Sequence, residues 1–219
     1  VHVEPGEQMV LGASDRRHCY HHFAVTKERM QRTPVGEARP FSEFAGLAGA
    51  VPAPPDESTL GCFGGLGMGD HGAVDITLGS HETVLEDAQV LTDESWIRSD
   101  RPHPDSVVSA AVAIDDLAVQ AKVPKHSRIE DLPRSSRPDL ELFDRAEKAY
   151  EKHGFEGSPS KERRGLSTDT QIGIDIQGRE GVGGAPKSRV LVLSFVSMLA
   201  AGLDVTTPYA LEVLSGTWT

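Results

Sequence analysis

The chain has 219 residues, which at about 150 residues per domain predicts one or two domains. Val, Leu, Ile and Phe together exceed the roughly 20% of residues below which a chain cannot bury enough apolar surface to fold. The formal net charge is −11, so no overall basic character indicates a nucleic-acid or anionic-membrane partner. A single basic groove on an acidic protein remains compatible with this charge.

Cysteine usage and hydropathy indicate an intracellular protein. Cys19 and Cys62 lie far apart and form no CxxC pair, which argues against a disulfide framework or a zinc knuckle and favours a reducing compartment. The apolar stretch 190–203 is interrupted by polar residues and is too short to span a bilayer. We therefore expect no membrane partner and a location in the nucleus or cytoplasm. Because the chain begins with Val1, we expect a fragment of a longer protein.

The first half of the chain contains a predicted strand, a loop and a helix. An apolar run from Met9 to Ala13 leads into Asp15 and predicts a strand, which the residues up to Val25 are able to continue. Gly and Pro dominate residues 46–55 and predict a loop. Apolar side chains recur every three or four positions over 71–91, which predicts a helix. Its expected stripe is Val74, Leu78, His81, Leu85 and Ala88.

The second half predicts a hairpin, a helix, a strand and a last helix. Residues 106–123 are small or β-branched up to Asp115-Asp116 and then alternate, as in a β-hairpin. Residues 139–153 form a helix that ends at Gly154, residues 171–177 alternate as a strand, and residues 187–203 form a helix. One face of the 139–153 helix is apolar: Leu142, Phe143, Ala146, Ala149 and Tyr150. The order predicts an α+β fold with helices packed on one face of an antiparallel sheet.

Aspartates are the first candidate functional residues. Asp115 and Asp116 stand together in an apolar context, where burying two ionised carboxylates is costly unless a cation compensates. Hard oxygen ligands of this kind match magnesium, and the alternative is a solvated turn. Asp15 ends its apolar run, and Tyr20 follows five residues later. On an extended chain these two side chains face opposite ways, so any cooperation requires a bend after Asp15; the alternative is a turn or helix-cap acid.

Three further motifs each have a functional interpretation and a purely structural one. The glycine run 61–72 contains a GxGxxG match, but a dinucleotide fingerprint needs a hydrophobic strand directly before it, and residues 60–64 do not supply one. The alternative is a flexible loop that leads into a helix and binds substrate. His18, Cys19, His21 and His22 cannot converge on one zinc ion if they lie on a strand. Lys161, in a loop, is by itself an ordinary solvated lysine.

Taken together and in this order, the motifs resemble the palm of a reverse transcriptase, the polymerase of retroelements. Segment 14–25 (SDRRHCYHHFAV) resembles the first catalytic motif, and segment 63–81 (FGGLGMGDHGAVDITLGSH) is similar to the second. The hairpin at 112–119 (VAIDDLAV) resembles the third, and 154–165 (GFEGSPSKERRG) resembles the fourth. The strand that follows the fourth motif is IGIDIQG at 172–178, and TTPYALEVLSGTWT at 206–219 resembles the segment that enters the thumb.

The resemblance implies an RNA-directed DNA polymerase that transfers deoxynucleotides to a primer on an RNA or DNA template. It implies that residues 1–185 form a palm with partial fingers and that 186–219 begin a thumb. Asp15 and Asp115 would bridge two Mg²⁺ ions, for which Mn²⁺ can substitute, with Asp116 as an adjacent support. Its oligomeric state does not follow from the resemblance.

The resemblance also implies roles around the nucleotide. Tyr20 would lie beneath the sugar and exclude a 2′-hydroxyl, while Gly65 and Met68 would line the nucleotide and template side. Lys161 would be a proton donor or charge stabiliser for the departing pyrophosphate. Five basic residues form one local patch, for which contact with phosphate and an ordinary solvated face are the two interpretations: Arg16, Arg17, Lys27, Arg29 and Arg32.

Departures from the family pattern leave other interpretations open. Ala113 stands where an aromatic residue usually precedes the paired aspartates, and Asp70 is an unusual neighbour for a phosphate. Because the basic finger residues would precede Val1, we expect this chain alone to be weak or inactive. The alternative is a decayed relic that folds, or binds nucleic acid, without activity. A dinucleotide-binding dehydrogenase domain on the glycine run is the third hypothesis.

Overall fold

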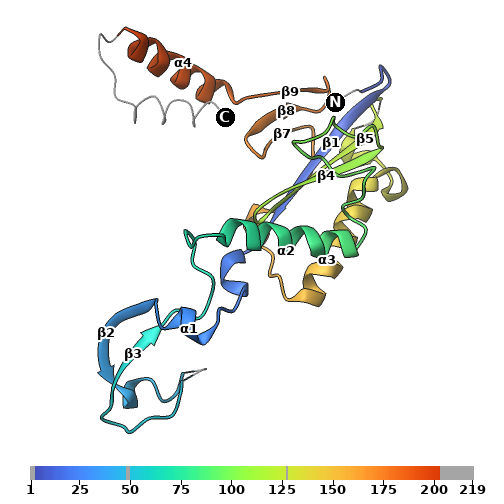
Figure 1. Cartoon of the computed structure of the whole chain (residues 1–219). Coiled ribbons are helices and arrows are strands. Elements are labelled where there is room, and N and C mark those ends of the chain that lie inside the picture. Colours follow the sequence, from blue (N-terminus) through green and yellow to red (C-terminus); the bar gives the residue numbers. More distant parts are fainter. Residues whose placement is uncertain (1–2, 48–49, 127, 203–219) are drawn as a thin grey trace.

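A four-stranded antiparallel sheet forms the centre of the protein (Figure 1). The computed structural model describes residues 3–47, 50–126 and 128–202. The strand order is β4-β5-β1-β6. The bounds of these strands are β1 Glu7–Asp15, β4 Val108–Ala113, β5 Asp116–Pro124 and β6 Arg163–Leu166.

Strand β1 is the buried middle of this sheet. It pairs with β5 over its whole length, from Glu7 opposite Pro124 to Asp15 opposite Asp116. On one face Met9 and Leu11 pack against Ile176, and on the other Val10 packs against its own cluster. Burial on both faces explains why β1 reads as a continuous apolar run rather than an alternating one.

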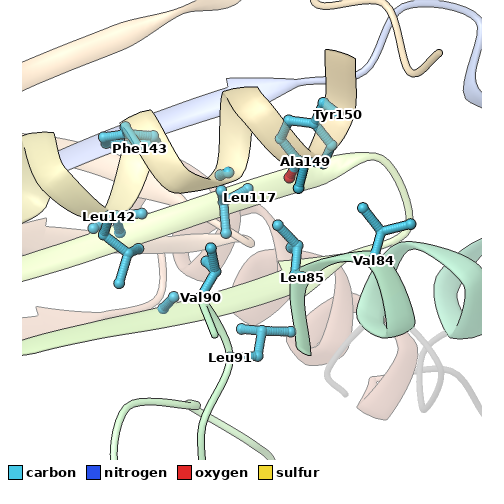
Figure 2. Packing of buried hydrophobic residues seen from close by; sticks show 12 residues of the cluster. Val84, Leu85, Val90, Leu91, Leu117, Leu142, Phe143, Ala149 and Tyr150 are labelled. Atoms are coloured by element: carbon cyan, nitrogen blue, oxygen red, sulfur yellow. The ribbon is translucent and has the colours of Figure 1, made fainter. Parts of the chain in front are cut away.

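Helices α2 (Ala73–Asp87) and α3 (Pro138–His153) pack against one face of this sheet and share a core with β4 and β5 (Figure 2). The predicted helix at 139–153 is confirmed, and all five residues of its expected apolar face are buried. It ends where Gly154 takes the left-handed conformation, as the sequence indicates. The buried cluster comprises Val84, Leu85, Val90, Leu91, Ala110, Leu117, Val119, Leu142, Phe143, Ala146, Ala149 and Tyr150.

Helix α2 is also confirmed, but its buried face is rotated from the expected stripe. His81 and Leu85 are fully buried as predicted. Val74 was expected on the same stripe and is exposed, so that prediction is wrong. Ala73 and Thr77 are buried instead, and Ala73 packs with Tyr20 and with Leu66 from the loop before the helix.

Two of the predicted strands differ in the structure. Residues 16–25 do not continue β1, because the chain bends after Asp15 and forms a 3-10 turn over Cys19–His22. His18 at the start of that turn has a φ of 53°. Segment 171–177 is a strand only over Ile174–Gln177 (β8), because Gln171 ends the preceding strand β7 (Thr168–Gln171). Ile172 and Gly173 form the turn between them, and both have the positive φ that a type I′ hairpin turn requires.

Smaller elements complete the described chain. Helix α1 is a single turn, and β2 and β3 form a separate two-stranded ribbon whose strands are not predicted by the sequence. Strands β7, β8 and β9 form a three-stranded sheet. The bounds are α1 Lys27–Met30, β2 Pro34–Pro40, β3 Ser58–Cys62, β7 Thr168–Gln171, β8 Ile174–Gln177 and β9 Val182–Gly184.

The last described element is helix α4 (Lys187–Ala201), which confirms the predicted final helix. Most of its apolar side chains are exposed, and Leu193 is the buried residue of the helix. Within the described ranges, neither this helix nor another one combines the length and apolar character needed to cross a membrane. The segment 206–219, which resembles the entry to a thumb, lies outside the described residues.

Glycine 12, in the centre of β1, is required by close packing of α3. A Cβ at this position would lie 2.7 Å from Phe143 Cε2 and 3.0 Å from the Arg163 carbonyl oxygen. We predict that Gly12→Ala lowers the free energy of unfolding by about 1–3 kcal/mol, as overpacking does. Gly79→Ala in α2 is the matched control, because a Cβ there meets nothing within 4 Å.

The control should raise the free energy of unfolding by about 1 kcal/mol, since alanine favours a helix over glycine. Urea denaturation of the two variants and the parent chain measures both effects. Equal stability of Gly12→Ala and the parent would contradict the packing described for β1 and α3.

Candidate metal centre

Three carboxylates from distant parts of the sequence meet at one end of the central sheet. Asp15 ends β1, and Asp115 and Asp116 stand at the turn between β4 and β5. One oxygen from each lies within 4.8 Å of the others. The pairing of Asp15 with Asp116 sets this proximity, and the Arg16 N–H donates a 2.9 Å hydrogen bond to the Asp115 carbonyl. Among the residues that the structure describes, these three carboxylates are the set of acidic, histidine or cysteine side chains close enough together to ligate one metal ion.

The three acids are in different environments. Asp15 is buried, Asp115 is half-buried and Asp116 is exposed. Loss of solvation raises the pKa of Asp115, and the charge of Asp15 raises that pKa further. Loss of solvation also raises the pKa of Asp116, together with the charges of Asp115 and Asp15. The free cluster therefore carries negative charge that its surroundings only partly balance, which favours binding of a hard cation.

Lys161 is brought into this cluster by the loop after α3. Its Nζ donates a 2.7 Å hydrogen bond to Asp15 Oδ2, although the lysine side chain is 62% exposed. This hydrogen bond raises the pKa of Lys161, while the lysine charge lowers the pKa of Asp115 and Asp116. The Ser158 N–H also donates to the Asp15 carbonyl, at 3.0 Å, and fixes the loop beside the strand end. Lys161 is therefore exposed, as expected of a loop lysine, and is also paired with Asp15.

Arg16, next to Asp15, does not belong to a phosphate-binding patch. It is 1% exposed, and its two terminal nitrogens donate to both carboxylate oxygens of Glu147 on α3, at 3.1 and 3.2 Å. Its guanidinium carbon lies 3.9 Å from the centre of the Tyr150 ring. The prediction that Arg16 is available to phosphate is wrong, because a buried guanidinium already has a bidentate partner.

A second buried polar contact, which the sequence does not predict, reaches the aspartate turn. His81 Nδ1 lies 2.8 Å from the Ile114 carbonyl oxygen, and His81 Nε2 lies 2.7 Å from the Tyr150 hydroxyl. Burial lowers the pKa of His81 to about 4, so the ring is neutral at neutral pH. The only signal in the sequence is a histidine on the apolar stripe of a helix.

The glycine run forms the loop that joins β3 to α2. Leu66 and Ala73 from this region pack with Tyr20 in a small buried cluster, against which Ile114 also packs. A Cβ on Gly65 would lie 3.3 Å from the His21 Cα, so glycine suits this close approach. Met68 is 81% exposed.

Asp70 stabilises the same loop. It accepts a 2.9 Å hydrogen bond from the Gly67 N–H and pairs with Arg29 at 3.0 Å, which explains an acid at this position. Strand β3 overlaps the start of the glycine run, but its side chains are exposed or half-buried and it ends five residues before Gly67, so it is not the buried hydrophobic strand of a dinucleotide fingerprint. It pairs antiparallel with β2 in the separate ribbon, so the βαβ unit required by a dinucleotide fingerprint is not formed there.

Comparisons with known proteins find similar folds among solved structures. No protein-family model and no curated protein sequence matches the chain. A solved structure of a foamy viral protease-reverse transcriptase in complex with double-stranded DNA matches with a TM-score of 0.54 and 12% identity, over 95% of this chain and 32% of that one. A second foamy viral protease-reverse transcriptase structure with double-stranded DNA gives a TM-score of 0.56 and 13% identity, over 96% of this chain and 27% of that one.

At this level of identity the likeness is one of fold. The chain has a mixed α/β arrangement of antiparallel sheets and helices that is compatible with a reverse-transcriptase-like fold. It spans about a quarter to a third of the length of the chains that it matches.

The neutral, buried His81 makes stability depend on pH. An unfolded histidine has a pKa near 6.5, whereas burial lowers the pKa of folded His81 to about 4. Between these values the unfolded chain binds a proton that the folded chain does not. We therefore predict that the contribution of His81 to the free energy of unfolding is complete above pH 6.5 and falls by about 3 kcal/mol as the pH drops to 4.

Urea denaturation of the parent chain and His81→Asn at half-unit steps from pH 7 to pH 4 isolates this contribution. The stability difference between the two proteins should shrink or reverse on acidification. A difference that is constant over this range would show that His81 is not neutral and buried.

Proposed function

We propose that the chain is the polymerase module of a reverse transcriptase. It would transfer deoxynucleotides to the 3′ end of a primer on an RNA or DNA template. The observation that carries this proposal is the convergence of Asp15, Asp115 and Asp116 on the described sheet. The likeness of the fold to foamy viral protease-reverse transcriptase structures that contain DNA supports it.

The three carboxylates fit a pair of Mg²⁺ ions by their chemistry. They supply hard oxygen ligands from two segments, and burial together with mutual repulsion raises the pKa of Asp115 and of Asp116, so a cation relieves the strain on their charged forms. Asp15 and Asp115 would bridge the ions, with Asp116 beside them. When bound, such ions stabilise the charge that develops on the attacking and leaving oxygens of a phosphate. Mn²⁺ has similar ligand preferences and would substitute.

Lys161 supplies the positive charge nearest to the carboxylates. Its exposed side chain is held at Asp15 by one hydrogen bond, so the ammonium is free to turn towards a phosphate that enters the site. There it would donate a proton to the departing pyrophosphate, or stabilise its charge. This assigns Lys161 a direct role in the chemistry.

Tyr20 would select the sugar of the incoming nucleotide. Its ring packs with Leu66 and Ala73, and Ile114, the residue before Asp115, packs on the same cluster. The Tyr20 ring therefore lies in the same cluster as the residue before Asp115. There it would exclude the 2′-hydroxyl of an incoming ribonucleotide. Gly65 and the exposed Met68, on the adjoining loop, would line the nucleotide and template side.

Primer extension tests the proposal. With a DNA primer on an RNA template, dNTPs and Mg²⁺, we expect weak extension by the parent chain and a loss of at least about 100-fold in Asp115→Asn, because one carboxylate of a metal pair is removed. Asp144→Asn is the matched control, since Asp144 lies on α3 in an ion pair with Arg134 and outside the carboxylate cluster. Extension should persist in this control.

The outcome also decides against the alternative of a decayed relic. Binding of primer-template by the parent chain without any extension would support the relic and contradict the proposed function. Equal extension by the parent chain and Asp115→Asn would show that the synthesis does not use this cluster.

Sugar selection tests the role of Tyr20. We expect Tyr20→Val to raise the incorporation of ribonucleotides relative to deoxynucleotides by about 10-fold or more, because the space for a 2′-hydroxyl opens. Single-nucleotide insertion with dNTP and NTP substrates measures the ratio of kcat/KM values. Unchanged selectivity, with extension retained, would place the sugar elsewhere.

A further inference from the structure

We propose that His81 and Tyr150 are positioning residues for the Asp115 turn. In this arrangement helix α3 holds both halves of the carboxylate cluster through two separate contacts. The inference rests on the proposed function of that cluster as a metal site. It assigns a role to a histidine and a tyrosine that touch neither the carboxylates nor any substrate position described above.

The hydrogen bonds that link Tyr150, His81 and Ile114 all donate towards the turn. The Ile114 carbonyl oxygen can only accept, so His81 Nδ1 must donate to it at 2.8 Å. In a neutral ring Nε2 then carries no proton and accepts from the Tyr150 hydroxyl at 2.7 Å. Burial raises the pKa of Tyr150, so its hydroxyl keeps the proton that it donates. Tyr150 on α3 thereby favours the Nδ1-protonated tautomer of His81, which donates to the turn.

The backbone of the turn is strained, so a hydrogen bond from a buried partner is needed to stabilise it. Ile114 and Asp115 are the two central residues of the β4–β5 hairpin turn, and Ile114 has a φ of 55°. Positive φ is unfavourable for a β-branched residue and persists only where the surroundings hold it. The hydrogen bond from His81 ends on the carbonyl of this same residue. Asp115 is the next residue, so the orientation of the turn determines where its carboxylate lies.

The other half of the cluster is held by the same helix. Arg16 follows Asp15 and makes its bidentate contact with Glu147, three residues before Tyr150 and therefore on the same face of α3. The Arg16 guanidinium also stacks on the Tyr150 ring. One turn of α3 thus contacts the residue after Asp15 directly and the residue before Asp115 through His81.

Direct metal binding tests the proposal without relying on polymerase activity. Mn²⁺ titration of the 219-residue chain, followed by electron paramagnetic resonance of the free ion, gives a Kd for each variant. We expect Tyr150→Phe, which keeps the ring and removes the hydroxyl, to raise the Kd several-fold. His81→Gln should raise it by about 10-fold or more, as loss of an outer partner of metal ligands does. His81→Asn places an amide N–H near the Nδ1 position, so its Mn²⁺ affinity should be closer to that of the parent chain than the affinity of His81→Gln is.

Val84→Ala is the control for a general loss of stability. Val84 lies three residues after His81 on α2 and packs in the main core cluster, whereas Ile114 of the turn packs in a different cluster. Its Mn²⁺ affinity should equal that of the parent chain although its free energy of unfolding falls. ¹⁵N NMR of the parent chain should show His81 protonated at Nδ1, and Tyr150→Phe should weaken this preference.

The outcomes separate the inference from the proposed function. Parent-like Mn²⁺ affinity in Tyr150→Phe and His81→Gln, with affinity lost in Asp115→Asn, would overturn the inference and leave the metal site in place. An equal loss in Val84→Ala would also overturn it, since the effect would then be one of stability. A parent chain that does not bind Mn²⁺ would overturn the inference and the proposed function together.

Discussion

The antiparallel pairing of β1 with β5 is the constraint on which the rest of the site depends. Its register ends with Asp15 opposite Asp116, so residues about 100 positions apart along the chain become neighbours. A one-residue slip of this pairing would turn the Asp15 side chain to the opposite face of the sheet. The register is strongly determined because β1 is buried on both faces and each face packs against a different cluster.

The acidic cluster is held in place by polar contacts on the helix side of the sheet. Alternation along the strand places Asp15 and Arg16 on opposite faces, so Arg16 reaches Glu147 on α3 while Asp15 reaches Lys161. Burying a guanidinium costs solvation, and the bidentate carboxylate offsets that cost. These contacts order a backbone that mutual repulsion of the carboxylates would otherwise disturb.

Much of this arrangement is predictable from local patterns in the sequence. The 3.6-residue periodicity identifies α3 with its buried face, and the alternation after Asp115 identifies the hairpin. The positive φ of Ile172 escapes prediction because an Ile-Gly turn lacks the usual asparagine or aspartate signal, so a hairpin reads as one strand. The partners of Arg16 and Lys161 depend on tertiary contacts across more than 100 residues, which periodicity does not encode. Asp15, Asp115 and Asp116 are found because their motifs resemble a known order, and their proximity follows from the fold.

Crystallography of the chain grown with Mn²⁺ tests the central claim most directly, because anomalous scattering locates the ion independently of any activity. The account predicts an anomalous peak between the carboxylates of Asp15 and Asp115, with the Lys161 ammonium moved away from Asp15. An ordered, fully occupied Mn²⁺ elsewhere on the protein, with these carboxylates free of metal and Lys161 still bonded to Asp15, would contradict it.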